Sequence, residues 1–142
     1  MSASVYFVVY GTPIGKGRPR ATSRGGFVRM YTDAKTLVFE AAVADEARIA
    51  MKEWEPFDTP MQLQLSAYYP IPKSWSKKKR QQAIDGDLHP QVKPDLDNVL
   101  KAVLDAINGV VYVDDSQVIN MVATKRYSSD PRVEVYLHEV LK

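Results

Sequence analysis

The spacing of the apolar residues changes period along this chain, and that change limits the folds open to it. Residues 4–10 are β-branched and aromatic, and residues 61–69 alternate apolar and polar side chains, the period of a half-buried strand. Residues 95–108 instead place their apolar residues at helical spacing. We therefore predict a single small α+β domain that covers all 142 residues.

The predicted elements form a mixed sheet of about five strands with two main helices and one short basic helix. Strands are expected at 4–10, 27–31, 61–69, 118–127 and 132–141, with the last two joined as a hairpin. Helices are expected at 34–54, 74–84 and 95–108, the first capped by Asp33, with Leu37, Ala41, Ala44, Ala47 and Met51 near one face. Residues 11–26 hold five Gly, two Pro and four basic residues, and are predicted to be a mobile basic loop.

The net charge of +2 conceals four blocks of strong charge. Residues 1–35 and 73–80 each carry a net charge of +5, whereas residues 36–72 are net acidic. Residues 81–115 contain seven Asp, two Lys and no Glu. Basic blocks beside an Asp-rich block suit a polyanion held over a metal site, although solvated surface explains any one block alone.

Composition removes several classes of protein. The apolar fraction of 45% and the charged fraction of 25% are those of a globular chain, and no segment has the ~20 apolar residues of a membrane span. The chain has no Cys, which excludes disulfides, thiolate metal sites and Cys nucleophiles. The first ten residues lack the pattern of a signal peptide, so a cytoplasmic location without a membrane partner is expected.

Carboxylates concentrate around the predicted helix 95–108. Asp95 and Asp97 stand at its start, where they could simply cap it, and Asp114 and Asp115 follow it, where they could form a turn. If the run 110–113 folded back along the helix, Asp115 would come close to Asp95 and Asp97. Such hard oxygen ligands, without Cys or a nearby His, suit Mg²⁺ or Mn²⁺.

Lys101 lies four residues after Asp97 and is expected on the same helix face. It could form an ion pair with Asp97 worth ~0.2–0.5 kcal/mol. It could instead stabilise negative charge that develops on a phosphate. The spacing does not separate these interpretations. Asp105 continues the same row and is predicted to be a solvated surface residue.

Residues 93–118, KPDLDNVLKAVLDAINGVVYVDDSQV, resemble the signature of the RusA family of Holliday junction resolvases. The shared pattern is DxDNxxK, a helix that ends Asp-Ala-Ile, and a following Asp-Asp pair. GTPIGKGRPR after the first strand and the last two strands also fit, so the resemblance covers nearly the whole chain. It implies a small homodimeric, Mg²⁺-dependent endonuclease that nicks two strands symmetrically at a four-way DNA junction in recombination and repair.

The resemblance also implies roles for individual residues. Asp95, Asp97 and Asp115 would bind the metal, with Asp114 as an adjacent acid, and Lys101 would be the catalytic lysine. A different structure-selective nuclease, a non-catalytic DNA-binding module and a protein-interaction role remain alternatives.

The remaining predicted site residues are those that would contact DNA. The phosphate-binding cations would be Lys16, Arg18, Arg20, Arg24, Lys77, Lys78, Lys79 and Arg80. Tyr31, Trp75 and Tyr69 could stack on open bases at the junction, although core packing is the simpler expectation for Tyr69.

Overall fold

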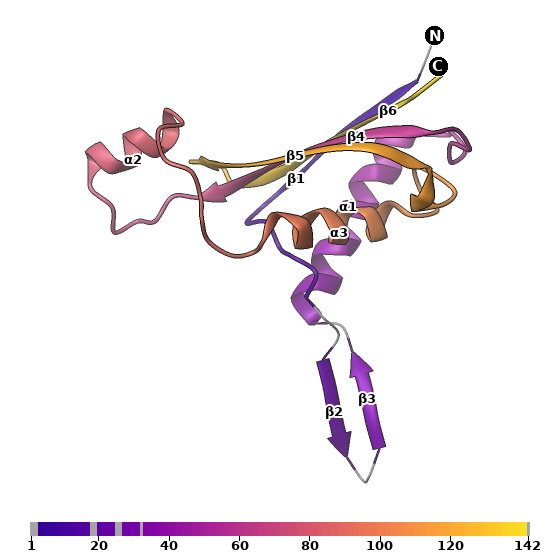
Figure 1. The fold of residues 1–142 in the computed structure, drawn as a ribbon, viewed down its shortest axis with the longest axis horizontal. Coiled ribbons are helices and arrows are strands. Elements are labelled where there is room, and N and C mark those ends of the chain that lie inside the picture. The colour runs from indigo at the N-terminus through magenta and orange to yellow at the C-terminus, as the bar shows by residue number, and fades with distance from the viewer. Residues whose placement is uncertain (1–2, 18–19, 25–26, 32, 142) are drawn as a thin grey trace.

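A computed structural model describes residues 3–17, 20–24, 27–31 and 33–141 as a four-stranded mixed sheet with three helices and a separate two-stranded hairpin (Figure 1). The strands are β1 (Ser4–Tyr10), β2 (Arg20–Arg24), β3 (Phe27–Tyr31), β4 (Met61–Pro70), β5 (Val118–Ser128) and β6 (Arg132–Glu139). The helices are α1 (Ala34–Met51), α2 (Lys77–Ile84) and α3 (Leu96–Ile107), with a 3₁₀ turn η1 (Asp115–Gln117). The predicted α+β class is confirmed, with four strands in the sheet instead of about five.

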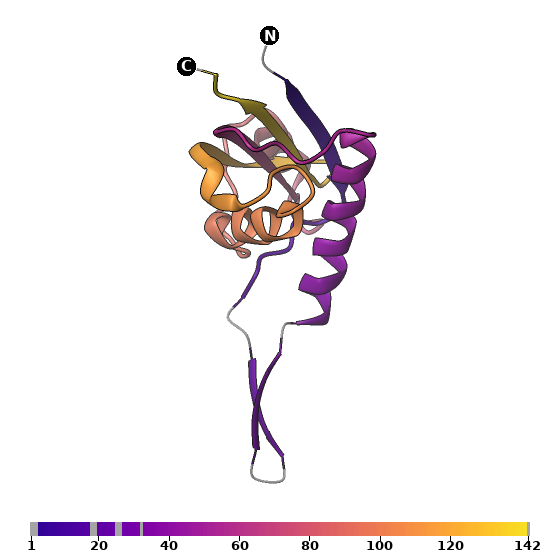
Figure 2. The same ribbon diagram turned by 90° about the vertical axis from the view of Figure 1, so that its right-hand side faces the viewer.

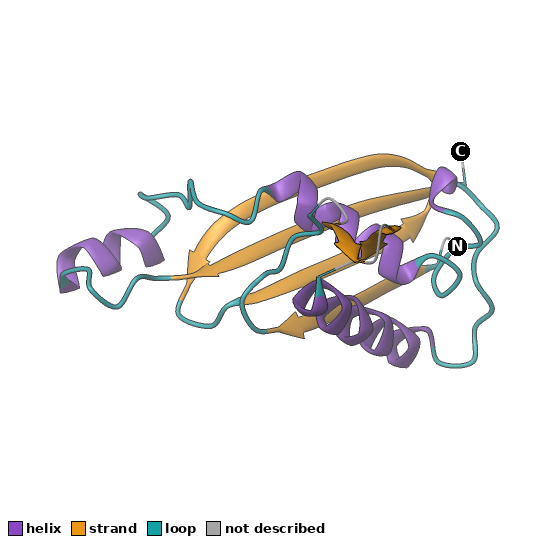
Figure 3. Cartoon of the chain, turned by 90° about the horizontal axis from the view of Figure 1, so that it is seen from below, coloured by secondary structure: helices purple, strands orange, loops and turns teal. Residues whose placement is uncertain are grey.

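The helices α1 and α3 cover one face of the sheet and leave the other face open (Figures 2 and 3). The reason lies in the alternation of the strands, since every second residue of β4, such as Leu63 and Leu65, is buried beneath the helices. Val43 of α1 and Val103 of α3 complete the same core and are inaccessible to solvent. No helix within the described ranges is long and apolar enough to cross a membrane.

The sheet order β1-β6-β4-β5 corrects the predicted hairpin of the last two strands. β4 lies between β5 and β6, parallel to β5 and antiparallel to β6. The connection of 129–131 crosses this gap of two strand spacings, ~10 Å, which three residues can span. The short connection therefore did not specify pairing.

Residues 20–24 correct the prediction that 11–26 lacks regular structure. They form β2, which pairs antiparallel with β3 from Arg20 opposite Tyr31 to Arg24 opposite Phe27. This stretch contains no Gly or Pro, so only its flanks resist pairing. The β2–β3 hairpin projects away from the sheet near the start of α1 (Figure 1). Arg18, a predicted DNA contact, lies outside the described residues.

The cap of α1 is confirmed, because the Asp33 carboxylate accepts a hydrogen bond of 2.8 Å from the Lys35 amide. The helix ends at Met51, before the predicted Trp54, where Lys52 takes a φ of 55°. Its buried residues are Thr36, Phe39, Val43, Ala44, Ala47 and Met51. Leu37 and Ala41, which were predicted to be buried, are exposed. The helix carries alanine on more than one face, so its apolar residues specify the buried stripe only weakly.

Candidate active site

The start of α3 presents two carboxylates to solvent. Val99 and Val103 bury the opposite side of the helix in the core, which leaves Asp97 exposed. Asp95 occupies the N-cap position, but its carboxylate makes no capping hydrogen bond with the described residues. The capping interpretation of Asp95 therefore lacks the contact on which it depends, and the carboxylate is available to a ligand.

Two residues from the sheet hold the segment that leads into Asp95. The Tyr69 hydroxyl at the end of β4 donates a hydrogen bond to the carbonyl of Pro94. Lys125 of β5 donates to the carbonyl of Val92 at 2.7 Å, and its amine lies 4.8 Å from the centroid of the Tyr69 ring. Burial, helped by the charge of Asp95, raises the pKa of Tyr69 to about 12, so the hydroxyl remains a donor.

Tyr69 is 1% exposed, which confirms core packing over base stacking for this ring. Its contact with Pro94 and the contact of Lys125 were not predicted. The sequence carries no signal for the contact of Lys125, because it depends on the pairing of β5 with β4, the strand that carries Tyr69. Only the parallel pairing of β4 with β5 brings both side chains to the segment before α3.

Gly15 and Lys16 hold the start of α3 from the other side. The Lys16 amide donates to the carbonyl of Asn98 at 2.9 Å. A Cβ atom on Gly15 would lie 2.8 Å from the Cβ of Pro94 and 3.0 Å from that of Asn98, so only glycine fits without a shift. The segment before β2 is thereby docked against the carboxylate-bearing end of α3.

The side chain of Lys16 forms ion pairs within the fold. Its amine lies 2.8 Å from Oδ2 of Asp105 and 3.0 Å from Oε1 of Glu40, and the side chain is 21% exposed. The hydrogen bond to Asp105 and the contact with Glu40 raise the pKa of Lys16. Asp105 is therefore a partner of Lys16, which corrects its prediction as a solvated surface residue.

Lys101 presents its amine to solvent, with its side chain 63% exposed. Its ion pair is with Asp105, four residues later, at 3.7 Å, and the expected pair with Asp97 does not form among the described side chains. An exposed pair at this distance contributes little stability. The amine thus stands on the same helix as Asp97, and this loose pair is its one ion pair with the described residues.

Asp114 and Asp115 lie at the opposite end of α3, which corrects the prediction that Asp115 returns to Asp95 and Asp97. The chain turns after Ile107 and is held to Phe57, whose amide and carbonyl form hydrogen bonds with residues 111 and 113. Burial of Val111 and Tyr112 fixes this turn. A helix of 12 residues, ~18 Å long, separates the two carboxylate groups.

The two acids of this pair differ in what they do. Asp114 caps η1: its carboxylate accepts hydrogen bonds from the amide and hydroxyl of Ser116, and its amide donates to Gln117. The Ser116 hydroxyl is the main cause that lowers the pKa of Asp114. The side chain of Asp115 is exposed and is not the capping group. The turn interpretation therefore applies to Asp114, and Asp115 is the more available ligand.

No three Asp, Glu or His side chains in the described part of the chain lie close enough together to hold a metal ion. The three-carboxylate cluster is therefore not assembled within one chain. Asp95 and Asp97 fit a different arrangement, because Mg²⁺ commonly takes one or two carboxylates together with substrate phosphates and water. The donor set at the start of α3 is compatible with that mode.

Helix α2 carries the second group of predicted DNA contacts. Lys77, Lys78, Lys79 and Arg80 are all exposed. Trp75 is half-buried against Tyr127, with ring centroids 5.4 Å apart, and the amine of Lys79 lies 4.1 Å from its centroid. One face of the Trp75 ring is thus covered by a cation, which limits its use for base stacking. The start of α3 lies between α2 and the β2–β3 hairpin (Figure 1).

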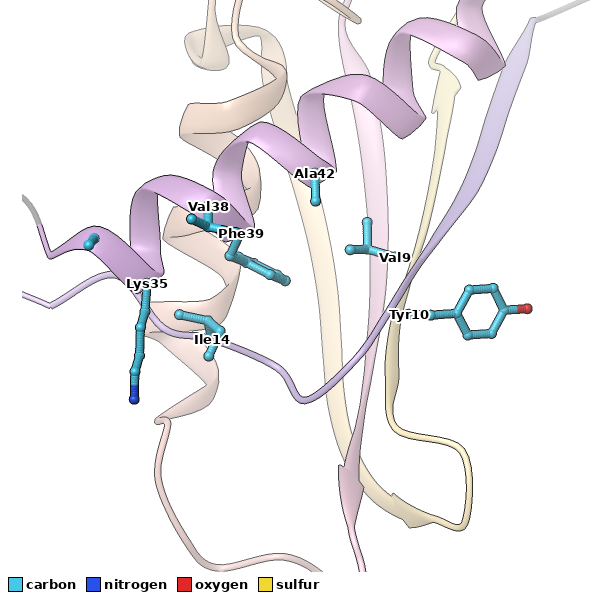
Figure 4. A pocket seen from close by; sticks show the side chains of 8 residues that line it. Val9, Tyr10, Ile14, Lys35, Val38, Phe39 and Ala42 are labelled. Carbon is cyan, nitrogen blue, oxygen red and sulfur yellow. The ribbon is translucent and has the colours of Figure 1, made fainter.

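A cavity of about 410 Å³ lies elsewhere, between β1 and the first half of α1 (Figure 4). Its lining is apolar and includes Val9, Ile14, Val38 and Phe39. Among the described residues that line it, Lys35 carries the one charged side chain.

Comparison with known proteins identifies the family of the chain. The family profile described as endodeoxyribonuclease RusA matches residues 10–138. The uncharacterized protein YqaN of Bacillus subtilis (strain 168) is 42% identical over 141 residues, which cover 96% of each chain. The chain belongs to the RusA family of endodeoxyribonucleases, the family of Holliday junction resolvases that its DxDNxxK motif resembles.

Proposed function

We propose that this protein is a Mg²⁺-dependent endonuclease that resolves four-way DNA junctions by paired symmetric nicks. The observation that carries the proposal is the start of α3. Asp95 and Asp97 are exposed there, the carboxylate of Asp95 is not used as a cap, and Lys101 follows on the same helix. Membership of the endodeoxyribonuclease family makes a phosphodiester the expected substrate bond.

Asp95 and Asp97 would hold the metal, whereas Asp114 and Asp115 lie at the other end of α3 and are left out of this ligand set. Mg²⁺ bound there would supply an activated water and neutralise charge on the scissile phosphate. The Lys101 amine would face the same phosphate and stabilise the additional negative charge. Mn²⁺ has similar ligand preferences and could replace Mg²⁺.

Basic elements on either side of this site would hold the DNA arms. Lys77, Lys78, Lys79 and Arg80 of α2 are exposed and form one group. Arg20 and Arg24 belong to β2 in the projecting hairpin, and Arg18, which lies outside the described residues, is proposed as a further DNA contact. Each phosphate contact would release counterions, so binding should weaken steeply with salt. Branched DNA is favoured because the cations occupy separate elements instead of one continuous stripe.

Paired symmetric nicks require two sites related by a two-fold axis. One chain has one DxDNxxK segment, so we propose that the active form is a homodimer. Action in DNA recombination and repair would follow from the junction substrate.

The decisive experiment compares wild type with Asp97→Asn on a labelled synthetic four-way junction, with and without Mg²⁺. We expect paired nicks that need the metal and that fall by about a hundredfold or more in the variant, while junction binding persists. Asp45→Asn, on the exposed face of α1, is a matched control for loss of one carboxylate.

Three results would contradict the proposal in different ways. Tight binding without cleavage in Mg²⁺ or Mn²⁺ would leave a DNA-binding module. Equal cleavage of flaps, forks and junctions would indicate a broader structure-selective nuclease. Weak binding to every DNA at moderate salt would favour a protein-interaction role.

A further inference from the structure

We propose that Lys16 is a positioning residue that occupies Asp105 and thereby leaves the amine of Lys101 free to face the scissile phosphate. The inference deepens the nuclease function proposed above and rests on it. It replaces the simpler expectation that Lys16 is one of the cations that bind DNA phosphates.

Two lysines share a single carboxylate oxygen. Oδ2 of Asp105 lies 2.8 Å from the amine of Lys16, a hydrogen-bond distance, and 3.7 Å from the amine of Lys101. The side chains are 21% and 63% exposed, respectively. Lys16 is therefore the principal partner of Asp105, and Lys101 is left largely in solvent.

The position of Lys16 is fixed by contacts other than Asp105. The carboxylate of Glu40 in α1 lies 3.0 Å from the Lys16 amine. The main-chain amide of Lys16 donates a hydrogen bond of 2.9 Å to the carbonyl of Asn98. Thr36, which is buried, donates to the carbonyl of Gly15 at 3.4 Å. The amine is thus held from two elements at once, which makes it a poor candidate for a cation that swings out to DNA.

Loss of the Lys16 charge would change the partner of Lys101. Glu40 and Asp105 would remain as two carboxylates, with Lys101 four residues before Asp105 on the same helix. A lysine and an aspartate at this spacing can form a weak ion pair when no stronger partner competes. Lys101 would then be drawn towards Asp105 and away from a phosphate bound near Asp97.

The test uses Lys16→Met, Lys16→Arg, Asp105→Asn and the double variant Lys16→Met/Asp105→Asn. Single-turnover cleavage of a four-way junction is measured in Mg²⁺, and the junction Kd is measured in Ca²⁺. We expect Lys16→Met to lower the cleavage rate about twofold while Kd stays unchanged. Asp105→Asn in the same chain should restore most of the rate, and Lys16→Arg should retain it.

A DNA contact at Lys16 would give the opposite pattern. Lys16→Met would then weaken junction binding and its salt dependence, leave the rate at saturating enzyme unchanged, and gain nothing from Asp105→Asn. Either that pattern or a failure of Asp105→Asn to restore the rate would overturn the proposal. Thermal unfolding checks every variant, and Lys16→Gln replaces Lys16→Met if the latter is unfolded, with the same loss of rate expected.

A second measurement does not depend on cleavage. The amine of Lys101 is labelled with acetic anhydride, and its modification is followed by mass spectrometry. In Lys16→Met it should react about twofold more slowly, because it is paired with Asp105, and Asp105→Asn should reverse this. Unchanged labelling overturns the inference about Lys16, whereas a wild type that cuts no DNA overturns the proposed function alone.

Discussion

Tyr69 and Tyr112 each use one hydroxyl to hold one end of α3. Tyr69 donates to the carbonyl of Pro94 before the helix, and Tyr112 donates to that of Leu104 near its end, at 2.7 Å. Both rings are almost completely buried. Burial raises the pKa of Tyr69 from 10.0 to about 12, so the stability from its protonated hydroxyl is present below pH 10 and is lost as the pH rises towards 12.

The two tyrosines form a matched pair for mutation. Tyr69→Phe and Tyr112→Phe should each lower the free energy of unfolding by about 1 kcal/mol, because each removes one buried hydrogen bond. Only Tyr69→Phe should also slow junction cleavage, since only Tyr69 holds the segment that carries Asp95. Urea unfolding and single-turnover cleavage measure the two effects. Equal cleavage rates in the two variants would show that the contact with Pro94 does not position Asp95.

The charge distribution of helix α2 is unfavourable for the stability of the helix itself. Four cations, residues 77–80, occupy its first half, next to the positive end of the helix dipole, and its first turn contains no acid. Ser76 caps it, and Ala83 is its one buried residue. These cations lower the stability of the helix, which is consistent with a role in binding a polyanion.

Replacement of residues 77–80 by glutamine tests the role of this element. The variant should bind junction DNA more weakly, and the slope of log affinity against log salt should fall by up to about 0.9 for each phosphate that is no longer neutralised. Its melting temperature should stay equal or rise slightly, since like charges at the helix start are removed. The control is Arg48→Gln/Lys52→Gln at the end of α1 remote from the hairpin (Figure 2). Equal salt slopes in both variants would exclude α2 as a DNA-binding element.

At the scale of the whole molecule, the start of α3 lies between two projecting basic elements, α2 and the β2–β3 hairpin (Figure 1). The carboxylates at 95 and 97 and those at 114 and 115 occupy opposite ends of this helix. One chain therefore offers one candidate cleavage site. A two-fold dimer would supply the second site that paired nicks need, and the homodimer remains a prediction.

A mixed dimer tests this prediction directly. The wild type should sediment at twice the 16.0 kDa mass of one chain. A dimer of one wild-type chain and one Asp97→Asn chain should nick one strand of a tethered junction, where the wild-type dimer nicks two. A monomer that makes paired nicks, or a mixed dimer that makes them at the wild-type rate, would contradict the two-site arrangement.

The sequence by itself determined the features that depend on neighbours along the chain. The strand alternation of 61–69, the Asp33 cap of α1 and the helix that follows Pro94 were all predictable, because a few adjacent residues specify each one. The same holds for the DxDNxxK motif, whose residues share one helix start. The sequence also identified Asp95, Asp97 and Lys101 as residues to test.

The tertiary structure alone decided which distant residues meet. The insertion of β4 between β5 and β6, the partnership of Lys16 with Asp105, and the separation of Asp115 from Asp95 all involve contacts between remote segments. Such contacts follow from burial of the whole core, which draws β4 to the centre of the sheet and takes Val111 and Tyr112 inside, so that the chain does not return along α3. Periodicity and spacing carry no information on these choices, because several pairings satisfy the same local pattern.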